Sequence, residues 1–141
     1  MSSQEKFALP GDKKSLEQGN ELTPKFDADG LLPAVVTNVD GGDVLMLAYM
    51  NEEALRLTIS TGKAHFWSRS RGEIWLKGET SGNVLEVMEL RTDCDQDTIW
   101  VKARISGDQI ACHTGKVSCF YRKITVENGE ISLVNDVLIV S

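Results

Sequence analysis

Short apolar runs separated by turn residues are the feature that most constrains the fold of this chain. Residues 33–39 and 44–50 are apolar nearly throughout, and Gly41-Gly42 lies between them. Two such runs joined by paired glycines predict a β-hairpin. Because neither strand has a polar side, we expect the hairpin to be covered on both faces. Residues 99–105 instead alternate apolar and polar side chains, which is typical of a strand with one buried face.

One helix interrupts the strands. Asn51 is a favoured N-cap, acidic residues follow it, and Gly62 is a suitable stop, so a helix is predicted over about 51–61. Farther along, Asn128-Gly129 suits a type I′ turn that joins a strand over 120–126 to one over 131–140. Further strands are predicted over 64–70, 73–77 and 84–91.

The predicted class is therefore α+β and strand-rich, with a twisted antiparallel sheet or pseudo-barrel and one main helix. At 141 residues the chain is expected to form a single domain over 29–141. Residues 1–28 are polar and weakly periodic, and they predict a flexible N-terminal arm with a short helix around 15–18.

Composition excludes several classes of protein. The net charge is −6, which argues against general nucleic-acid binding, because that binding depends on basic residues contacting phosphates. No apolar run approaches the ~20 residues of a membrane span, and the N-terminus lacks the apolar core of a secretory signal. A cytoplasmic protein is expected.

The three cysteines are the first candidate ligand set. Cys94, Cys112 and Cys119 all lie within residues 91–122, although their spacing is not the C-x-x-C of most structural zinc sites. Three thiolates with an open fourth position would suit catalytic zinc, whereas three buried thiols are the simpler alternative. Two aspartates flank Cys94, which argues against apolar burial. His113 follows Cys112 and is interpreted as an acid/base group rather than a fourth ligand.

Asp93, Asp95 and Asp97 form a second candidate set. In an extended segment their carboxylates would share one side and Cys94 would face the other, which predicts separate oxygen-lined and sulfur-lined sites. Oxygen ligands suit Mg²⁺ or Ca²⁺. A calcium-binding loop is excluded, because Thr98 and Arg104 stand where it needs Gly and Glu. A solvated acidic turn remains the alternative.

A third set of residues has the chemistry of a nucleotide-binding surface. It combines basic groups, hydroxyl donors and indoles that could stack on a base. Its members are Trp67, Arg69, Arg71, Trp75, Lys77, Thr80 and Ser81. A solvated hairpin with core tryptophans would explain the same composition.

Several motifs together resemble one family. They are Glu52-Glu-Ala-Leu, Phe66-Trp-Ser-Arg-Ser-Arg, Trp75-Leu-Lys-Gly-Glu-Thr-Ser-Gly, Asp93-Cys-Asp-Gln-Asp, Ala111-Cys-His-Thr-Gly and Ser118-Cys-Phe-Tyr. In this order, over residues 31–122, they resemble phosphoribosyl-AMP cyclohydrolase of histidine biosynthesis. The 19 residues after Arg122 are too few for a second domain, so a monofunctional chain is expected.

The resemblance implies an activity and a set of ligands. The activity is hydrolytic opening of the adenine ring of 1-(5-phosphoribosyl)-AMP between N1 and C6, by an intertwined homodimer with one zinc and one magnesium per subunit. Cys94 of one chain would join Cys112 and Cys119 of the other on zinc, and Asp93, Asp95 and Asp97 would hold magnesium.

The expected mechanism uses a zinc-activated water, with His113 as the proton shuttle. The substrate-binding residues would be Trp67, Arg69, Arg71, Lys77, Thr80 and Ser81. Two alternatives stay open. One is a zinc nucleobase deaminase, although its H-x-E and P-C-x-x-C signature is absent from this sequence. The other is a non-catalytic zinc-binding interaction module.

Overall fold

The computed structural model describes residues 7–136. The first six residues of the predicted arm and the part of the predicted strand over 131–140 that follows Asp136 lie outside the described residues. Its helices are α1 (Lys13–Gln18) and α2 (Glu52–Thr61). Its strands are β1 (Leu32–Asn38), β2 (Val44–Met50), β3 (His65–Ser68), β4 (Glu73–Leu76), β5 (Leu85–Thr92), β6 (Ile99–Ile105), β7 (Arg122–Glu127) and β8 (Glu130–Asn135). The strand-rich α+β class predicted from the sequence is confirmed, and so are the two helices.

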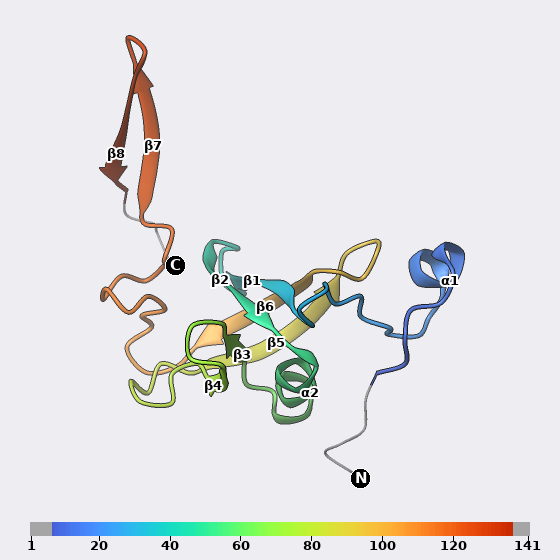
Figure 1. The fold of residues 1–141 in the computed structure, drawn as a ribbon. Helices are drawn as coiled ribbons and strands as arrows, with labels where there is room; N and C mark the ends of the chain where they lie inside the picture. The colour runs from blue at the N-terminus through green and yellow to red at the C-terminus, as the bar shows by residue number, and fades with distance from the viewer. Residues whose placement is uncertain (1–6, 137–141) are drawn as a thin grey trace.

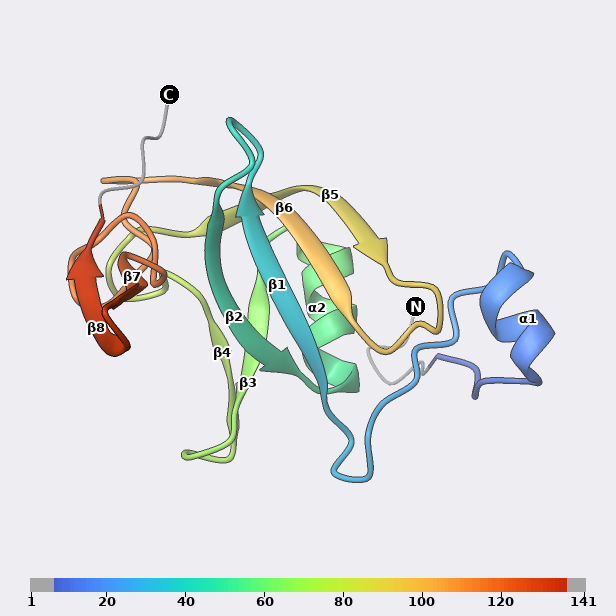
Figure 2. The same cartoon turned by 90° about the horizontal axis from the view of Figure 1, so that it is seen from above.

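Six strands form one curved sheet in the order β4-β3-β2-β1-β6-β5, while β7 and β8 form a separate hairpin. Figure 2 shows the sheet curling around α2, and Figure 1 shows the β7–β8 hairpin projecting from it. One strand pair departs from the antiparallel prediction: β1 and β6 run parallel, with Ala34 opposite Ile99. The period of two on each strand shows which face is buried, but not the direction of a distant partner strand.

The β1–β2 hairpin forms where the paired glycines predict it. Both glycines adopt positive φ (102° for Gly41 and 87° for Gly42), and the Asn38 amide donates to the Asp43 carbonyl at 2.8 Å. The expectation that both faces are covered is wrong for the single chain. Val44 is 38% exposed and Leu47 is 48% exposed, because α2 covers only one face of the sheet.

Helix α2 is capped at both ends as its sequence predicts. The Asn51 side chain accepts from the Ala54 amide at 2.8 Å, and Gly62 ends the helix in the left-handed conformation. Its buried face, Ala54 and Leu55, packs on the same side of the sheet as the core residues of β1, β2, β3 and β6. Among residues 7–136, no helix is long and apolar enough to cross a membrane.

Candidate metal centre

The turn between β5 and β6 brings the three aspartates together. Asp93 Oδ1 accepts hydrogen bonds from the Asp97 amide at 3.0 Å and the Thr98 amide at 3.2 Å. Carboxylate oxygens of Asp93, Asp95 and Asp97 all lie within 4.8 Å of one another. The extended conformation assumed from the sequence is wrong here, because a tight turn with Gln96 at φ 57° replaces it. The turn itself makes the carboxylates converge.

The clustered carboxylates perturb one another. Burial alone would raise the pKa of Asp93, but hydrogen bonds from the side chains of Asp97 and Asp95 and from backbone amides lower it. The hydrogen bond to Asp93, with burial and the neighbouring negative charges, raises the pKa of Asp97 to about 6. Three ionised carboxylates therefore repel at neutral pH. A divalent cation would relieve that repulsion, and the donor set fits a hard, oxygen-preferring ion.

We expect Asp97→Asn to stabilise the metal-free protein at pH 7, by at most about 1 kcal/mol because solvent screens these charges. The raised pKa of Asp97 means that its ionised form costs stability above pH ~6, and this cost fades as the folded protein takes up the proton. The gain should therefore shrink between pH 7 and pH 5. Thermal melts in chelator at both pH values test this. An equal difference in Tm at both would contradict it.

Gln96 ties this turn to the N-terminal segment. It is 5% exposed, its side-chain oxygen accepts from the Thr23 amide at 2.8 Å, and its Nε2 donates to the Leu16 carbonyl at 2.8 Å. The Lys25 amide also donates to the Gln96 carbonyl at 2.7 Å. Residues 16–25 are thus hydrogen-bonded directly to the aspartate turn. Sequence reasoning missed this residue, since a glutamine between two aspartates carries no local signal of burial.

Two thiols meet in the loop between β6 and β7. The Cys112 amide donates to the Lys116 carbonyl at 3.1 Å, which turns the chain back on itself. The Cys119 amide then donates to the Leu45 carbonyl at 2.8 Å, and the buried Ser118 hydroxyl donates to the Val44 carbonyl at 2.6 Å. These bonds fasten the loop to β2.

The surroundings of the two sulfurs favour one thiolate. Burial would raise the pKa of Cys112, but the Thr114 hydroxyl, which donates to its Sγ at 3.1 Å, and the hydrogen bond with Cys119 lower it. Partial burial of the Cys119 sulfur and its hydrogen bond with Cys112 raise the pKa of Cys119 to about 11. The Lys77 ammonium lowers the pKa of both thiols. A paired thiolate and thiol suit a soft cation such as zinc, which binds cysteine as thiolate.

Cys94 lies apart from this pair. It is exposed on the aspartate turn before β6, whereas Cys112 and Cys119 lie on the loop after β6. Within residues 7–136, the three aspartates are the one group of three potential ligands that converges. A single described chain therefore supplies two of the three predicted sulfur ligands. His113 is exposed beside Cys112.

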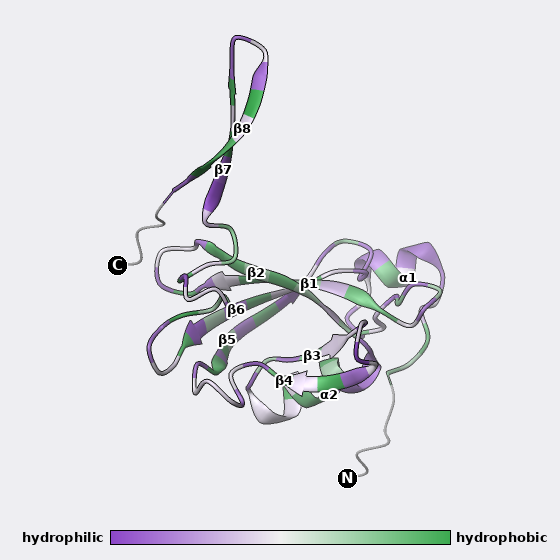
Figure 3. Cartoon of the chain, turned by 60° about the vertical axis from the view of Figure 1, so that its left-hand side comes forward, coloured by the Kyte–Doolittle hydropathy of each residue, from purple (hydrophilic) through white to green (hydrophobic). Residues whose placement is uncertain are grey.

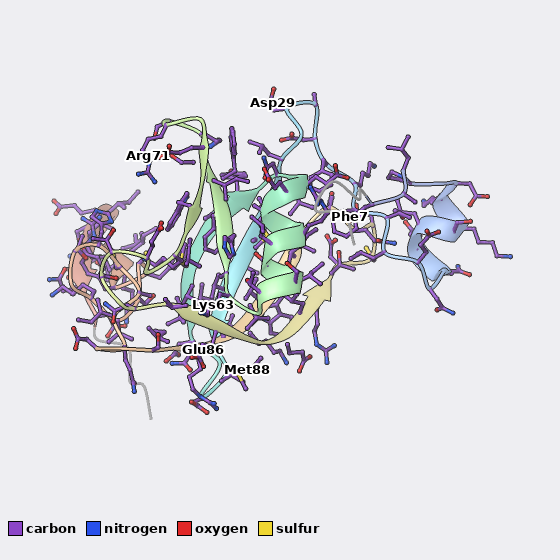
Figure 4. All side chains as sticks on the ribbon, turned by 90° about the horizontal axis from the view of Figure 1, so that it is seen from below. Phe7, Asp29, Lys63, Arg71, Glu86 and Met88 are labelled. Atoms are coloured by element: carbon purple, nitrogen blue, oxygen red, sulfur yellow. The ribbon has the colours of Figure 1, made fainter. Side chains whose placement is uncertain are left out.

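The predicted substrate-binding residues divide between two places. Arg71 lies at the tip of the β3–β4 hairpin (Figure 4). Its guanidinium pairs with the Glu73 carboxylate at 3.6 Å. Nearby, the Arg69 guanidinium lies 4.1 Å from the centre of the Tyr49 ring, and Trp67 is half-buried on β3. Lys77 instead follows the opposite end of β4, on the side of the thiols.

The loop after Lys77 carries the remaining predicted contacts. Thr80 and Ser81 are both exposed on it. Trp75 packs its ring against Phe66, 5.3 Å between centroids, which is a core contact. Neither the closeness of Lys77 to the sulfurs nor the Thr114 contact was predicted, because both depend on the folded loop.

A strand-rich α+β chain with three carboxylates on one loop and two thiols on another has the donor sets of a metal-dependent enzyme. Comparison with known proteins identifies its family: the profile of phosphoribosyl-AMP cyclohydrolase matches residues 46–121. The chain belongs to the phosphoribosyl-AMP cyclohydrolase family. It is therefore a hydrolase of a cyclic amidine, as the resemblance implies.

Curated members of the same family align with most of the chain. A phosphoribosyl-AMP cyclohydrolase from Brucella anthropi is 62% identical over 126 residues, 89% of each chain. Another from Brucella canis is 56% identical over 126 residues, 89% of this chain and 91% of the relative. One from Rhizobium etli is 53% identical over 127 residues, 89% and 85% respectively.

Proposed function

We propose that this chain opens the adenine ring of 1-(5-phosphoribosyl)-AMP in histidine biosynthesis, as a cytoplasmic homodimer with one zinc and one magnesium per subunit. The observation that best supports the metal assignment is that the candidate ligands lie on two separate loops. The Cys112 and Cys119 thiols lie on one loop and perturb each other's pKa, while Cys94 lies between Asp93 and Asp95 on another loop.

Two ligand sets follow from this separation. Cys112 and Cys119 of one copy, with Cys94 of a second copy, would hold zinc. Asp93, Asp95 and Asp97 would hold magnesium. When bound, zinc supplies a Lewis acid that makes a water molecule nucleophilic near neutral pH. The Thr114 hydroxyl and the Lys77 ammonium favour the thiolate form that the site needs.

The remaining residues bind substrate and move protons. In the reaction, a water oxygen bonds to C6 of the purine and the C6–N1 bond breaks. From the neutral imino form of the base, one proton of the water ends on N1 and the other on the exocyclic nitrogen, so C6 becomes a carboxamide carbon. His113, exposed next to Cys112, would carry the proton that N1 takes up. Arg69 and Arg71 would bind the 5′-phosphates. Trp67 would stack on the base, and Lys77, Thr80 and Ser81 would add further polar contacts.

A metal-resolved assay tests this function. The purified protein with zinc and magnesium should convert phosphoribosyl-AMP to a product followed by absorbance, and chelation should abolish turnover. Cys112→Ser should lose zinc and at least about 100-fold in activity. Asp95→Asn should keep its zinc but need more magnesium. Elemental analysis is the second readout: equal zinc loss in both variants would contradict two separate sites, and no turnover with both metals would overturn the function.

A further inference from the structure

The β7–β8 hairpin has one apolar face that the described chain leaves uncovered. In its register Ile124 lies opposite Leu133 and Val126 opposite Ile131, so these four side chains share a face. They are 71%, 56%, 66% and 77% exposed, respectively. The other face is largely polar and carries a 2.8 Å hydrogen bond between the Thr125 and Ser132 hydroxyls. An isolated two-stranded hairpin is marginal in water unless its apolar face packs against something.

A second uncovered apolar surface lies on the large sheet. Opposite the face packed on α2, β1, β2 and β6 place Val35, Leu47 and Trp100 at matched register positions. Leu47 is 48% exposed and Trp100 is 39% exposed. We call this surface the open sheet face. It extends to a depression that Val35, Trp100 and Asp93 line together, so it reaches the aspartate turn.

Figures 1 and 3 show the hairpin rising on the side of the sheet opposite α2, which is the side of the open sheet face. Yet one chain does not bring the two surfaces together. The Cys119–Leu45 backbone bond fixes the chain to β2 three residues before β7, and the Asp136 amide closes the base of the hairpin on the Tyr121 carbonyl at 2.8 Å. The short tether directs the hairpin away from its own sheet.

We propose that β7–β8 is an arm whose face of Ile124, Val126, Ile131 and Leu133 packs on the open sheet face of a second copy of this chain. A second copy is the occupant favoured here because each chain offers both surfaces, so a two-fold pair satisfies both at once. This inference rests on the homodimer of the proposed function and names the surface that forms it. The arm begins just after Cys119, so its docking is linked to completion of the shared thiol site.

Two matched double variants test the arm. Ile124→Lys with Leu133→Glu removes the apolar face but leaves a cross-strand pair of opposite charges, which preserves the hairpin. Thr125→Lys with Ser132→Glu places the same charges on the polar face at an equally opposed pair. Light scattering and sedimentation across protein concentrations give the dimer dissociation constant. We expect the first variant to raise it at least about tenfold and the second to leave it near the parent value.

A third variant tests the open sheet face, on which the arm would pack. Leu47→Lys should weaken the dimer in the same way, and circular dichroism should show that all variants keep their fold. An unchanged dissociation constant in both Ile124→Lys/Leu133→Glu and Leu47→Lys overturns the arm. A second result would also overturn the arm: Ile124→Lys/Leu133→Glu keeps the parent dissociation constant but lowers the Tm as much as truncation of the chain after Asp136 does. That result would mean that the apolar face is covered by residues of the same chain.

These experiments distinguish a failure of the arm proposal from a failure of the proposed function. A parent dimer that lacks turnover with both metals removes the function and leaves the arm in place. An active parent dimer that both surface variants leave intact removes the arm and keeps the function. A parent that is monomeric at all concentrations overturns the arm, whatever its activity.

Discussion

Mixed dimers of Cys94→Ala and Cys119→Ala chains are expected to regain about a quarter of the wild-type activity, although each variant alone is inactive. Random exchange makes about half of the dimers mixed, and one of the two sites in each mixed dimer then has all three cysteines. The expectation follows from the position of Cys94 before β6 and of the Cys112–Cys119 pair after it. Turnover and zinc content after re-annealing measure the recovery.

The chain offers a matched control for this experiment. Cys112 and Cys119 lie on the same loop and would supply the same zinc site from one chain, so mixing Cys112→Ala with Cys119→Ala chains leaves every site with one cysteine missing. No activity should return. Subunit exchange can be verified with chains that carry tags of different mass. Failure of the first mixture despite proven exchange, or recovery in the control, would show that each site is built within one subunit.

Gly78→Ala is expected to cost about 3 kcal/mol or more of unfolding free energy. Gly78 has φ 86°, which costs other residues about 1–2 kcal/mol, and an added Cβ would lie 2.3 Å from the Asn83 carbonyl carbon. That neighbour is backbone, held in place because the Asp108 amide donates to the Asn83 side chain at 2.7 Å. The loop must therefore shift, and Lys77 beside it would shift relative to the thiols. Denaturant unfolding measures the loss.

Gly82→Ala is the control in the same loop. Gly82 has φ 83°, but its added Cβ would have no atom within 4 Å. Its cost should be limited to the backbone term of about 1–2 kcal/mol. Equal losses at the two glycines would show that the contact with Asn83 is not what makes Gly78 necessary.

Local chemistry explains most of what the sequence could predict about the fold. The Gly41-Gly42 and Asn128-Gly129 turns form as expected, and the latter pair adopts φ 52° and 81°. The caps Asn51 and Gly62 bound α2. In each case the signal and the structure it determines lie within a few residues of each other, so no distant partner is needed to interpret it.

The site was predicted less completely, because its contacts join distant parts of the chain. The identities of the aspartates and cysteines followed from ligand chemistry, but the turn at Asp93 does not follow from spacing. Gln96 bonds residues more than 70 positions away, and Lys77 acts on Cys112 across two loops. Such contacts appear only after the sheet has formed.

The parallel pairing of β1 with β6 has a kinetic consequence. The β1–β2, β3–β4 and β5–β6 pairs join neighbouring strands, whereas Ala34 and Ile99 pair although β2, α2, β3, β4 and β5 all lie between them in the chain. Closing so long a loop costs conformational entropy before the strand pairing contributes any stabilising free energy. A high contact order therefore slows folding. We expect the local hairpins to form early and the seam between β1 and β6 to close late. The aspartate turn, at the start of β6, would then reach its place beside residues 16–25 only in the final stage of refolding.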